Sequence, residues 1–391
     1  MHRFLLAAIA STGAGSSAAT VQAAEDIRLP VGFAVLVAHD SARLAGGHTA
    51  RPMQITIWYP SVSRAGAAMT YRDYVELVAG ERDALITAEA RATAVADVRA
   101  PLHAHGVPDS LIDRWLDRPM VAIRGVPPRA GRFPLVLIAQ GNGESPHDQV
   151  VLAELLASRG YLVATTPSPM RIAGPLTDEN QIGRRAQEQA DDLAFTVDRM
   201  RLRTDVDPSR LSIIGHSFGV RGGLLLAMQR PVVALVSLDG GIGTSTGFLQ
   251  MRCAISTHDE LPRTSILHFY EEVDPFMKPD FTLLLGLRSS ERWLVHVRGM
   301  HHHHFTSLGT IGNGDTQVRA ATGGDSVTLM MAELVNAATV QFLDAVVKLQ
   351  PTARARLERG SLLESFDRVT HLAAGEETAF GVATCPLAPV R

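Results

Sequence analysis

The sequence predicts an α/β fold in which a mostly parallel central sheet carries helices on both faces. From residue 133 onward, short apolar runs alternate with longer amphipathic segments, which is the pattern of repeated strand–helix units. The run Phe133–Ala139 is continuously apolar, as expected for a strand buried on both faces. Apolar residues make up 46% of the 391 residues and charged residues 20%, so burial can offset the chain entropy lost on folding.

The first residues are predicted to be an export signal rather than part of the fold. A positive start, Met1-His2-Arg3, is followed by a short apolar run and then by small residues. Val21 and Ala23 suit the small-residue cleavage pattern, so we expect a cut after residue 23. The mature protein is then periplasmic or secreted. The alternative is a frayed N-terminal helix.

Residues 24–350 are expected to form one domain. Met53–Pro60 alternates and is rich in β-branched residues, so it predicts a strand closed by proline. Residues 71–117 are rich in Ala, Glu, Asp and Arg with apolar residues at helical spacing, which predicts a helical insertion. Residues 351–391 are expected to be a C-terminal extension with a peripheral helix and a tail.

The remaining elements follow in alternation. The predicted strands are Phe133–Ala139, Tyr161–Thr166, Leu211–Ile214, Val232–Leu238, Ser265–Tyr270 and Trp293–Val297. The predicted helices are Asp148–Arg159, Gly183–Leu202, Phe218–Gln229 and Val327–Lys348. In a sheet of this kind, reactive groups gather beyond the carboxyl ends of the strands.

Composition argues against several classes of protein. The formal net charge is −3, which does not suit sequence-independent binding to nucleic-acid phosphates. No run approaches the roughly 18 apolar residues that a membrane-spanning helix needs, so no integral membrane segment is expected in the mature chain. Cys253 and Cys385 are the only cysteines. Two cysteines are too few for a zinc site built on several thiolates. Their spacing leaves open whether they pair in an oxidising compartment.

The motif Gly215-His216-Ser217-Phe218-Gly219 directly follows a predicted strand and opens a Gly-rich helix. A nucleophilic serine needs a sharp, strained turn that projects its hydroxyl above the sheet, and flanking glycines relieve the crowding. The free N–H groups of the helix that follows favour a developing negative charge. We therefore predict Ser217 as a nucleophile; the alternative is a structural turn.

A serine hydroxyl needs a base, and the base needs an orienting acid, in the chain order Ser, Asp or Glu, His. The run His301–His304 follows the last predicted strand and supplies the candidate bases. A metal site or incidental surface histidines are the alternatives, although adjacent residues on a short loop cannot all face one ion.

Two aspartates compete for the role of the acid. Asp239 directly follows an apolar strand, 22 residues after Ser217, and two glycines come after it. Asp274 begins an Asp-Pro turn after the next strand, where aspartate is often structural. This local chemistry favours Asp239, with Asp274 as its rival.

An acyl-transfer site also needs two backbone N–H donors for the oxyanion. Phe218, the residue after the nucleophile, is expected to supply one. Asn142, in the turn Gln140-Gly141-Asn142-Gly143 after the first buried strand, is expected to supply the other. The alternative is a plain Gly-rich turn.

Together these segments resemble the α/β-hydrolases, and more narrowly the dienelactone hydrolases and the secreted platelet-activating-factor acetylhydrolases. The similarity runs over about residues 50–345 outside the insertion. In the histidine loop of that family, the base lies three residues after the glycine and three before the phenylalanine, and both counts select His302. Asp239 fits the acetylhydrolase position for the acid, and Asp274 fits the dienelactone one. The chain departs from the common pattern with Gln140 before Gly141, and with serine where true dienelactone hydrolases have cysteine.

The resemblance and the residues together imply an exported serine hydrolase that cleaves small carboxylic esters through Ser217, His302 and Asp239, without a metal or an organic cofactor. Three alternatives stay open. They are a non-catalytic binding protein on the same scaffold, a metal-binding protein that uses the histidine run, and a peptidase or thioesterase that uses the same residues. The sequence does not indicate an oligomeric state or a particular ester.

Overall fold

A computed structural model describes residues 28–45, 49–82, 86–176, 181–256, 263–312 and 315–375. The expected signal segment, residues 1–23, lies outside these residues. Cys385 and the side chain of Cys253 also lie outside them, so the question of their pairing does too.

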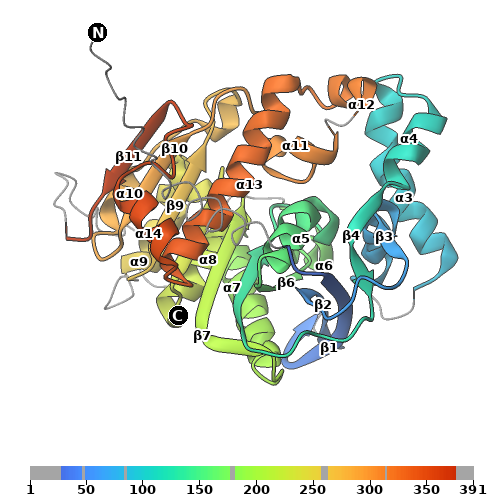
Figure 1. Ribbon diagram of the computed structural model, residues 1–391, viewed down its shortest axis with the longest axis horizontal. Coiled ribbons are helices and arrows are strands. Elements are labelled where there is room, and N and C mark those ends of the chain that lie inside the picture. The colour runs from blue at the N-terminus through green and yellow to red at the C-terminus, as the bar shows by residue number, and fades with distance from the viewer. Residues whose placement is uncertain are drawn as a thin grey trace, which may run out of the picture.

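Within the described residues, one sheet of eleven strands runs through the molecule in the order β11-β10-β9-β8-β7-β5-β6-β2-β1-β4-β3 (Figure 1). The six strands from β10 to β6 in that order pair in parallel, whereas β11 and β2 pair antiparallel with the two edges of that block. The strands are β1 (Val31–Ala45), β2 (Thr49–Pro60), β3 (Ala68–Thr70), β4 (Pro119–Arg124), β5 (Phe133–Ala139), β6 (Leu162–Thr166), β7 (Val206–His216), β8 (Ala234–Leu238), β9 (Ser265–Tyr270), β10 (Arg292–His296) and β11 (Arg368–Leu372).

Strand β5 shows why the central strands are apolar throughout. Val136 and Ile138 belong to the hydrophobic core on one face of the sheet, and Leu135 and Leu137 belong to the core on the other. Successive side chains of a strand point to opposite faces, so a strand covered on both sides needs an apolar residue at every position. The mostly parallel sheet with helices on both faces, predicted from the sequence, is confirmed.

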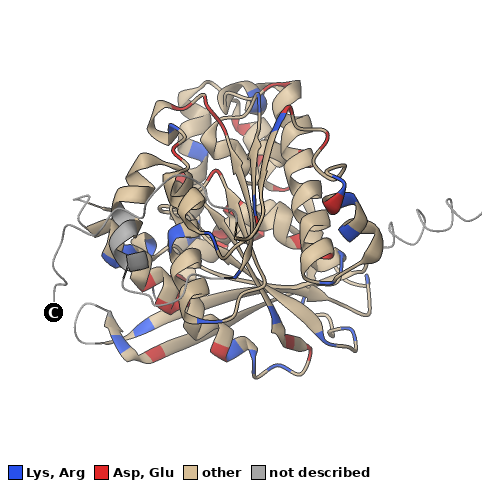
Figure 2. Ribbon diagram, turned by 90° about the vertical axis from the view of Figure 1, so that its left-hand side faces the viewer, with Lys and Arg blue, Asp and Glu red and all other residues tan. Residues whose placement is uncertain are grey.

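Helices cover both faces of the sheet (Figures 1 and 2). One face packs against α6 (Pro169–Ala173), α7 (Gln181–Met200), α8 (Gly219–Gln229), α9 (Ser245–Ser256) and α10 (Thr282–Gly286). The other packs against α2 (Tyr71–Val75), α3 (Ala88–Ala104), α4 (Asp109–Leu116), α5 (Val150–Ser158), α11 (Leu308–Ile311), α12 (Thr316–Ala321), α13 (Ser326–Val346) and α14 (Pro351–Glu358). Short 3-10 turns are η1 (Glu76–Gly80), η2 (Pro146–Gln149), η3 (Gly241–Gly243), η4 (Pro275–Met277) and η5 (His302–Phe305).

Helix α7 illustrates how the sequence pattern fixes which side is buried. Ala186, Ala190, Leu193, Val197 and Met200 are all buried in the same core. Their spacing of three or four residues places them on one stripe of a helix. Each large apolar side chain that is fully buried stabilises the folded state by about 1.5–3 kcal/mol relative to the same side chain left exposed to water.

The helical segment between β3 and β4 is anchored to the sheet by a buried polar relay. Trp58 on β2 donates its indole N–H to the hydroxyl of Tyr74 on α2 at 3.1 Å. That hydroxyl in turn donates to Glu154 on α5 at 2.8 Å. Because all three side chains are buried, each needs the others to satisfy its hydrogen bonds.

Two features differ from the sequence expectations. Residues 368–372 form β11, which pairs antiparallel with β10, so the C-terminal extension adds a strand to the central sheet. Helix α13 is long and apolar enough to cross a membrane by length and composition, and half of its most apolar window is buried inside the protein. It packs against β8, β9 and α14, as the core helix of a globular protein does.

Charged residues of both signs are interspersed in the view of Figure 2.

Candidate active site

Ser217 lies on a sharp turn between β7 and α8. Its backbone has a φ of 52°, a left-handed conformation that costs a residue with a Cβ about 1–3 kcal/mol. A Cβ on Gly215 would lie 2.5 Å from the Cα of Val220, and a Cβ on Gly219 would lie 2.0 Å from the carbonyl oxygen of Ala139. Only glycine fits at either position, so the two glycines allow the turn that raises Ser217 above the sheet.

A hydrogen-bonded chain joins three of the predicted residues. The Nε2 atom of His302 lies 2.8 Å from the Oγ atom of Ser217, and its Nδ1 atom lies 2.6 Å from a carboxylate oxygen of Asp239. An ionised carboxylate only accepts hydrogen bonds, so the Nδ1 atom carries the ring proton and Nε2 is free to accept the serine proton. The structure therefore brings Ser217, His302 and Asp239 together in the order that acyl transfer requires.

Asp239 and Asp274 both reach the histidine loop, but they contact different parts of it. Asp239 is 1% exposed and contacts the ring of His302. Asp274 accepts the backbone N–H of His302 at 2.7 Å and lies 3.0 Å from the Nδ1 atom of His301. Burial acts to raise the pKa of Asp274, but these hydrogen bonds outweigh it and leave the pKa below its ordinary value. Asp274 therefore holds the loop and does not face the ring of His302.

The other histidines of the run have partners of their own. The Nε2 atoms of His303 and His304 lie 2.7 and 2.9 Å from the carbonyl oxygen of Thr322, and the Nδ1 atom of His304 accepts the N–H of His301. Burial lowers the pKa of His304 to about 4, which keeps it neutral near pH 7. Among the described residues, no group of three or more His, Cys, Asp or Glu side chains is placed to hold a metal ion.

The turn after β5 leaves one N–H group unengaged. The N–H of Gly141 donates to Glu144, that of Gly143 to Ser168, and that of Glu144 to the carbonyl of Gly141. Among the described residues, no protein acceptor lies within hydrogen-bonding reach of the N–H of Asn142 or of that of Phe218. The turn lies beside the serine, because Gly219 packs directly on the backbone of residues 139–140.

Gln140, which precedes Gly141 at the start of this turn, points inward. Its side chain is fully buried and donates to Thr165 at 3.0 Å. The backbone carbonyl oxygen of Gln140 accepts a hydrogen bond from the side-chain amide of Gln189 on α7 at 2.7 Å. The start of the turn is therefore fixed to β6 on one side and to α7 on the other.

Sequence reasoning missed three residues that border the site. Glu144 pairs with His216 beside the ring of His302. Phe276 on η4 is 66% exposed, and its ring makes an edge contact with His302 at a centroid distance of 5.4 Å. Glu271 links the two aspartate turns, since its N–H donates to Asp239 and its carboxylate accepts the N–H of Asp274. All three directly follow strands or lie in the next turn, so the strand-end rule could have drawn attention to them.

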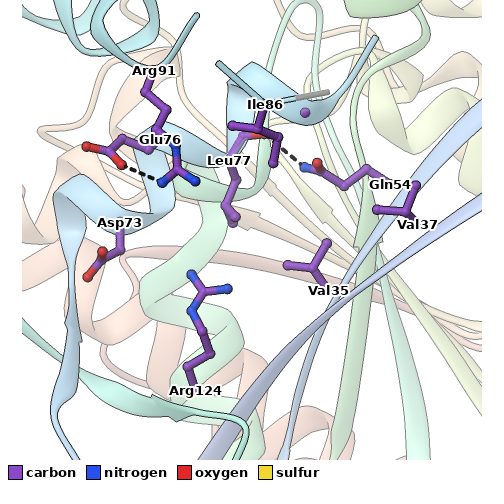
Figure 3. A pocket seen from close by; sticks show the side chains of 10 residues that line it. Val35, Val37, Gln54, Asp73, Glu76, Leu77, Ile86, Arg91 and Arg124 are labelled. Atoms are coloured by element: carbon purple, nitrogen blue, oxygen red, sulfur yellow. Dashed lines mark hydrogen bonds and ion pairs between the residues drawn. The ribbon is translucent and has the colours of Figure 1, made fainter. Parts of the chain in front are cut away.

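A separate hollow lies between β1, β2 and the helical insertion (Figure 3). It has a volume of about 400 Å³, with apolar walls that include Val35 and Leu77. The side chain of Arg124 points into it (Figure 3), and Gln54 donates to the carbonyl of Leu77 at its edge. None of the residues that line this hollow belongs to the Ser217 site.

Comparison with solved structures supports the fold that was predicted from the sequence. The structure is similar to that of a ferulic acid esterase from Streptomyces cinnamoneus, with a TM-score of 0.61 over 90% of this chain and 98% of that one. The chain has an α/β-hydrolase fold. The two sequences are 19% identical, so the likeness concerns the hydrolase fold alone. No family model matches the sequence.

Proposed function

We propose that this α/β-hydrolase-fold protein is a serine esterase that cleaves carboxylic esters through an acyl-enzyme intermediate. The observation that carries the proposal is the continuous hydrogen-bonded chain from Ser217 through His302 to Asp239. The strained backbone adds support: Ser217 and Asp239 are two of only three non-glycine residues with a positive φ in the described chain, and strain of this kind gathers at active sites.

The mechanism follows from the position of each group. Ser217 attacks the acyl carbon while His302 takes its proton at Nε2, and Asp239 stabilises the imidazolium that forms. The N–H groups of Phe218 and Asn142 stabilise the oxyanion, where the loss of one donor typically costs about 2.7–4 kcal/mol. His302 then gives its proton to the departing alcohol, and water releases the acid from Ser217.

The exposed ring of Phe276 favours an ester with an apolar or aromatic group. This ring contacts His302, which donates a proton to the leaving oxygen, so it lies on the alcohol side of the scissile bond. The structural neighbour is an esterase by its name, which agrees with an ester substrate. Of the two families that the sequence resembles, the position of Asp239 favours the acetylhydrolase arrangement. The N-terminal signal pattern supports a role outside the cytoplasm.

The test is hydrolysis of a panel of p-nitrophenyl and alkyl esters that vary in acyl length and in alcohol. We expect the wild type to hydrolyse part of the panel and Ser217→Ala to lose nearly all of that activity. Ser209→Ala is the matched control, because Ser209 is an exposed serine at the other end of β7 and its loss leaves the site intact. Equal activity in wild type and Ser217→Ala would contradict the proposal.

A further inference from the structure

Glu144 and His216 come from the ends of neighbouring strands. Glu144 lies in the turn after β5, and His216 is the last residue of β7, directly before Ser217. The two strands pair in parallel, with Ala139 opposite Gly215. The two side chains therefore meet at the edge of the sheet where the turn that holds Asn142 and the turn that holds Ser217 both lie.

Glu144 uses its carboxylate to join these two turns. One oxygen pairs with the Nδ1 atom of His216, and the other accepts the N–H of Gly141 at 2.6 Å. Its backbone carbonyl also accepts the N–H of Ser168 at 3.1 Å. By occupying the N–H of Gly141, Glu144 fixes the turn in the form that leaves the N–H of Asn142 free for an oxyanion.

His216 extends the connection to the loop of the base. Its Nε2 atom lies 3.1 Å from the carbonyl oxygen of His302, and its ring stacks on the ring of His302 at a centroid distance of 4.7 Å. A carbonyl oxygen only accepts hydrogen bonds, so Nε2 carries a proton. With a carboxylate at Nδ1, the buried ring is a paired imidazolium.

The electrostatic environment agrees with this charged pair. Burial is the largest single influence and acts to lower the pKa of His216, but the charge and hydrogen bond of Glu144, the carbonyl of His302 and the charge of Asp239 together raise the pKa above its ordinary value. For Glu144, burial is again the largest single influence and acts to raise the pKa, but the charge and hydrogen bond of His216, the N–H of Gly141 and the charge of His302 together lower it. His216 is only 2% exposed, so a buried charge left without its partner would destabilise this region.

From these contacts, we infer that Glu144 and His216 form a positioning pair. The pair holds the oxyanion turn, the serine turn and the histidine loop in a fixed position relative to one another. The inference rests on the proposed esterase function. Neither side chain lies between the reacting atoms. The pair acts through the backbone of Gly141, through the chain next to Ser217, and through the carbonyl and the ring of His302.

The expected consequence is kinetic rather than only structural. If the pair sets the geometry of the donors and the base, its loss lowers kcat by about 10–100-fold, because transition-state contacts depend on placement within about 1 Å. KM changes by less than about threefold, because the pair does not contact bound substrate. A merely structural pair would lower the melting temperature and leave kcat per active site unchanged.

The experiment measures kcat, KM and melting temperature for Glu144→Gln, His216→Phe and the double variant, with active sites counted by fluorophosphonate titration. His216→Phe keeps a ring against His302 and removes both hydrogen bonds. Two residues that act as one unit are non-additive, so we expect the double variant to lose no more than either single one. Asp192→Asn is the matched control. Asp192 on α7 is a buried carboxylate that pairs with Arg51 on β2 and makes no hydrogen bond to Ser217, His302 or Asp239, so its loss lowers the melting temperature and leaves kcat unchanged.

Several results would overturn the inference. Glu144→Gln with wild-type kcat and KM would overturn it while the esterase proposal stands. A wild type that neither hydrolyses any ester nor reacts with the fluorophosphonate would overturn both. If the variants do not fold, ¹⁵N NMR of the wild-type His216 ring decides the case. Two protonated ring nitrogens at neutral pH support the pair, and a neutral ring contradicts it.

Discussion

Two turns at the same edge of the sheet each supply an aspartate to the histidine loop, and they do so differently. The turn after β8 holds Asp239, which is buried, has a φ of 43° and contacts the ring of His302. The turn after β9 holds Asp274, which is more exposed and contacts the backbone N–H of His302. Position at a strand end is therefore not enough to assign a catalytic acid; the ring nitrogen that the carboxylate faces decides.

The largest loss of activity is expected when Asp239, the aspartate that contacts the ring of His302, is substituted. Asp239→Asn replaces an acceptor at Nδ1 with a group that can present an N–H there, so the ring is no longer held in the productive tautomer. By analogy with serine hydrolases of known mechanism, we expect kcat to fall about 10⁴-fold, measured on the best ester of the panel. A loss of less than tenfold would show that another acid does this work.

A smaller effect is expected at Asp274. Asp274→Ala removes the acceptors of the His302 backbone N–H and of the His301 ring, and the loosened loop lowers kcat by about 10–100-fold. Asp274→Asn is the matched variant, since its amide oxygen still accepts the backbone N–H, and it retains more activity. If kinetic assays rank Asp274→Asn below Asp239→Asn, the roles assigned to the two turns are reversed.

The turn after β9 also carries Phe276, which has no counterpart after β8. Phe276→Ala is expected to raise KM about two- to tenfold for esters of aromatic alcohols, because an aromatic pair contributes about 0.5–1.5 kcal/mol. Esters of small alcohols are expected to change little. Leu202→Ala is the control, since Leu202 is 76% exposed at a site remote from the Ser217 turn. Equal KM changes across all alcohols would remove Phe276 from substrate binding.

The smallest effect concerns Glu271, which connects the two turns. Burial, together with the charges of Asp239 and Asp274, raises the pKa of Glu271 to about 7 despite hydrogen bonds from the N–H groups of Asp274 and Val273. The folded state thus binds this proton more tightly than the unfolded chain, whose glutamate has a pKa near 4.5. The free energy of unfolding that depends on Glu271 therefore falls as pH rises from about 4.5 to 7.

Glu271→Gln removes that titration. Urea unfolding of wild type and variant across this pH window is expected to show a shallower decline in the variant. Parallel curves would mean that Glu271 does not titrate differently in the folded state.

Much of the fold was predictable from the sequence because its central strands are buried on both faces. The limits of β5 and β9 coincide with the predicted runs. The strands β1, β3, β4 and β11, at or near the two edges of the sheet, were not predicted, since strands in such positions mix polar and apolar residues: in β11 only Leu372 is buried. Their pairing depends on neighbours distant in the chain, which local periodicity does not reveal.

The candidate site was predictable where backbone constraints mark the sequence. The glycines around Ser217 are dictated by close backbone approach, and the strand ends placed Asp239 and His302 at one edge. The strand-end rule brings Glu144 and His216 to the same edge, but their pairing was missed because it depends on the lateral order of β5 and β7 in the sheet. That order arises from tertiary packing and leaves no short motif.

The proposed esterase function depends on His302 making Ser217 nucleophilic. The most direct measurement is reaction of the folded protein with a fluorophosphonate probe, followed by mass spectrometry of its peptides. We expect one adduct, on Ser217, whose formation is abolished in Ser217→Ala and slowed by several orders of magnitude in His302→Ala. An adduct on another serine, or an unchanged rate in His302→Ala, would contradict it.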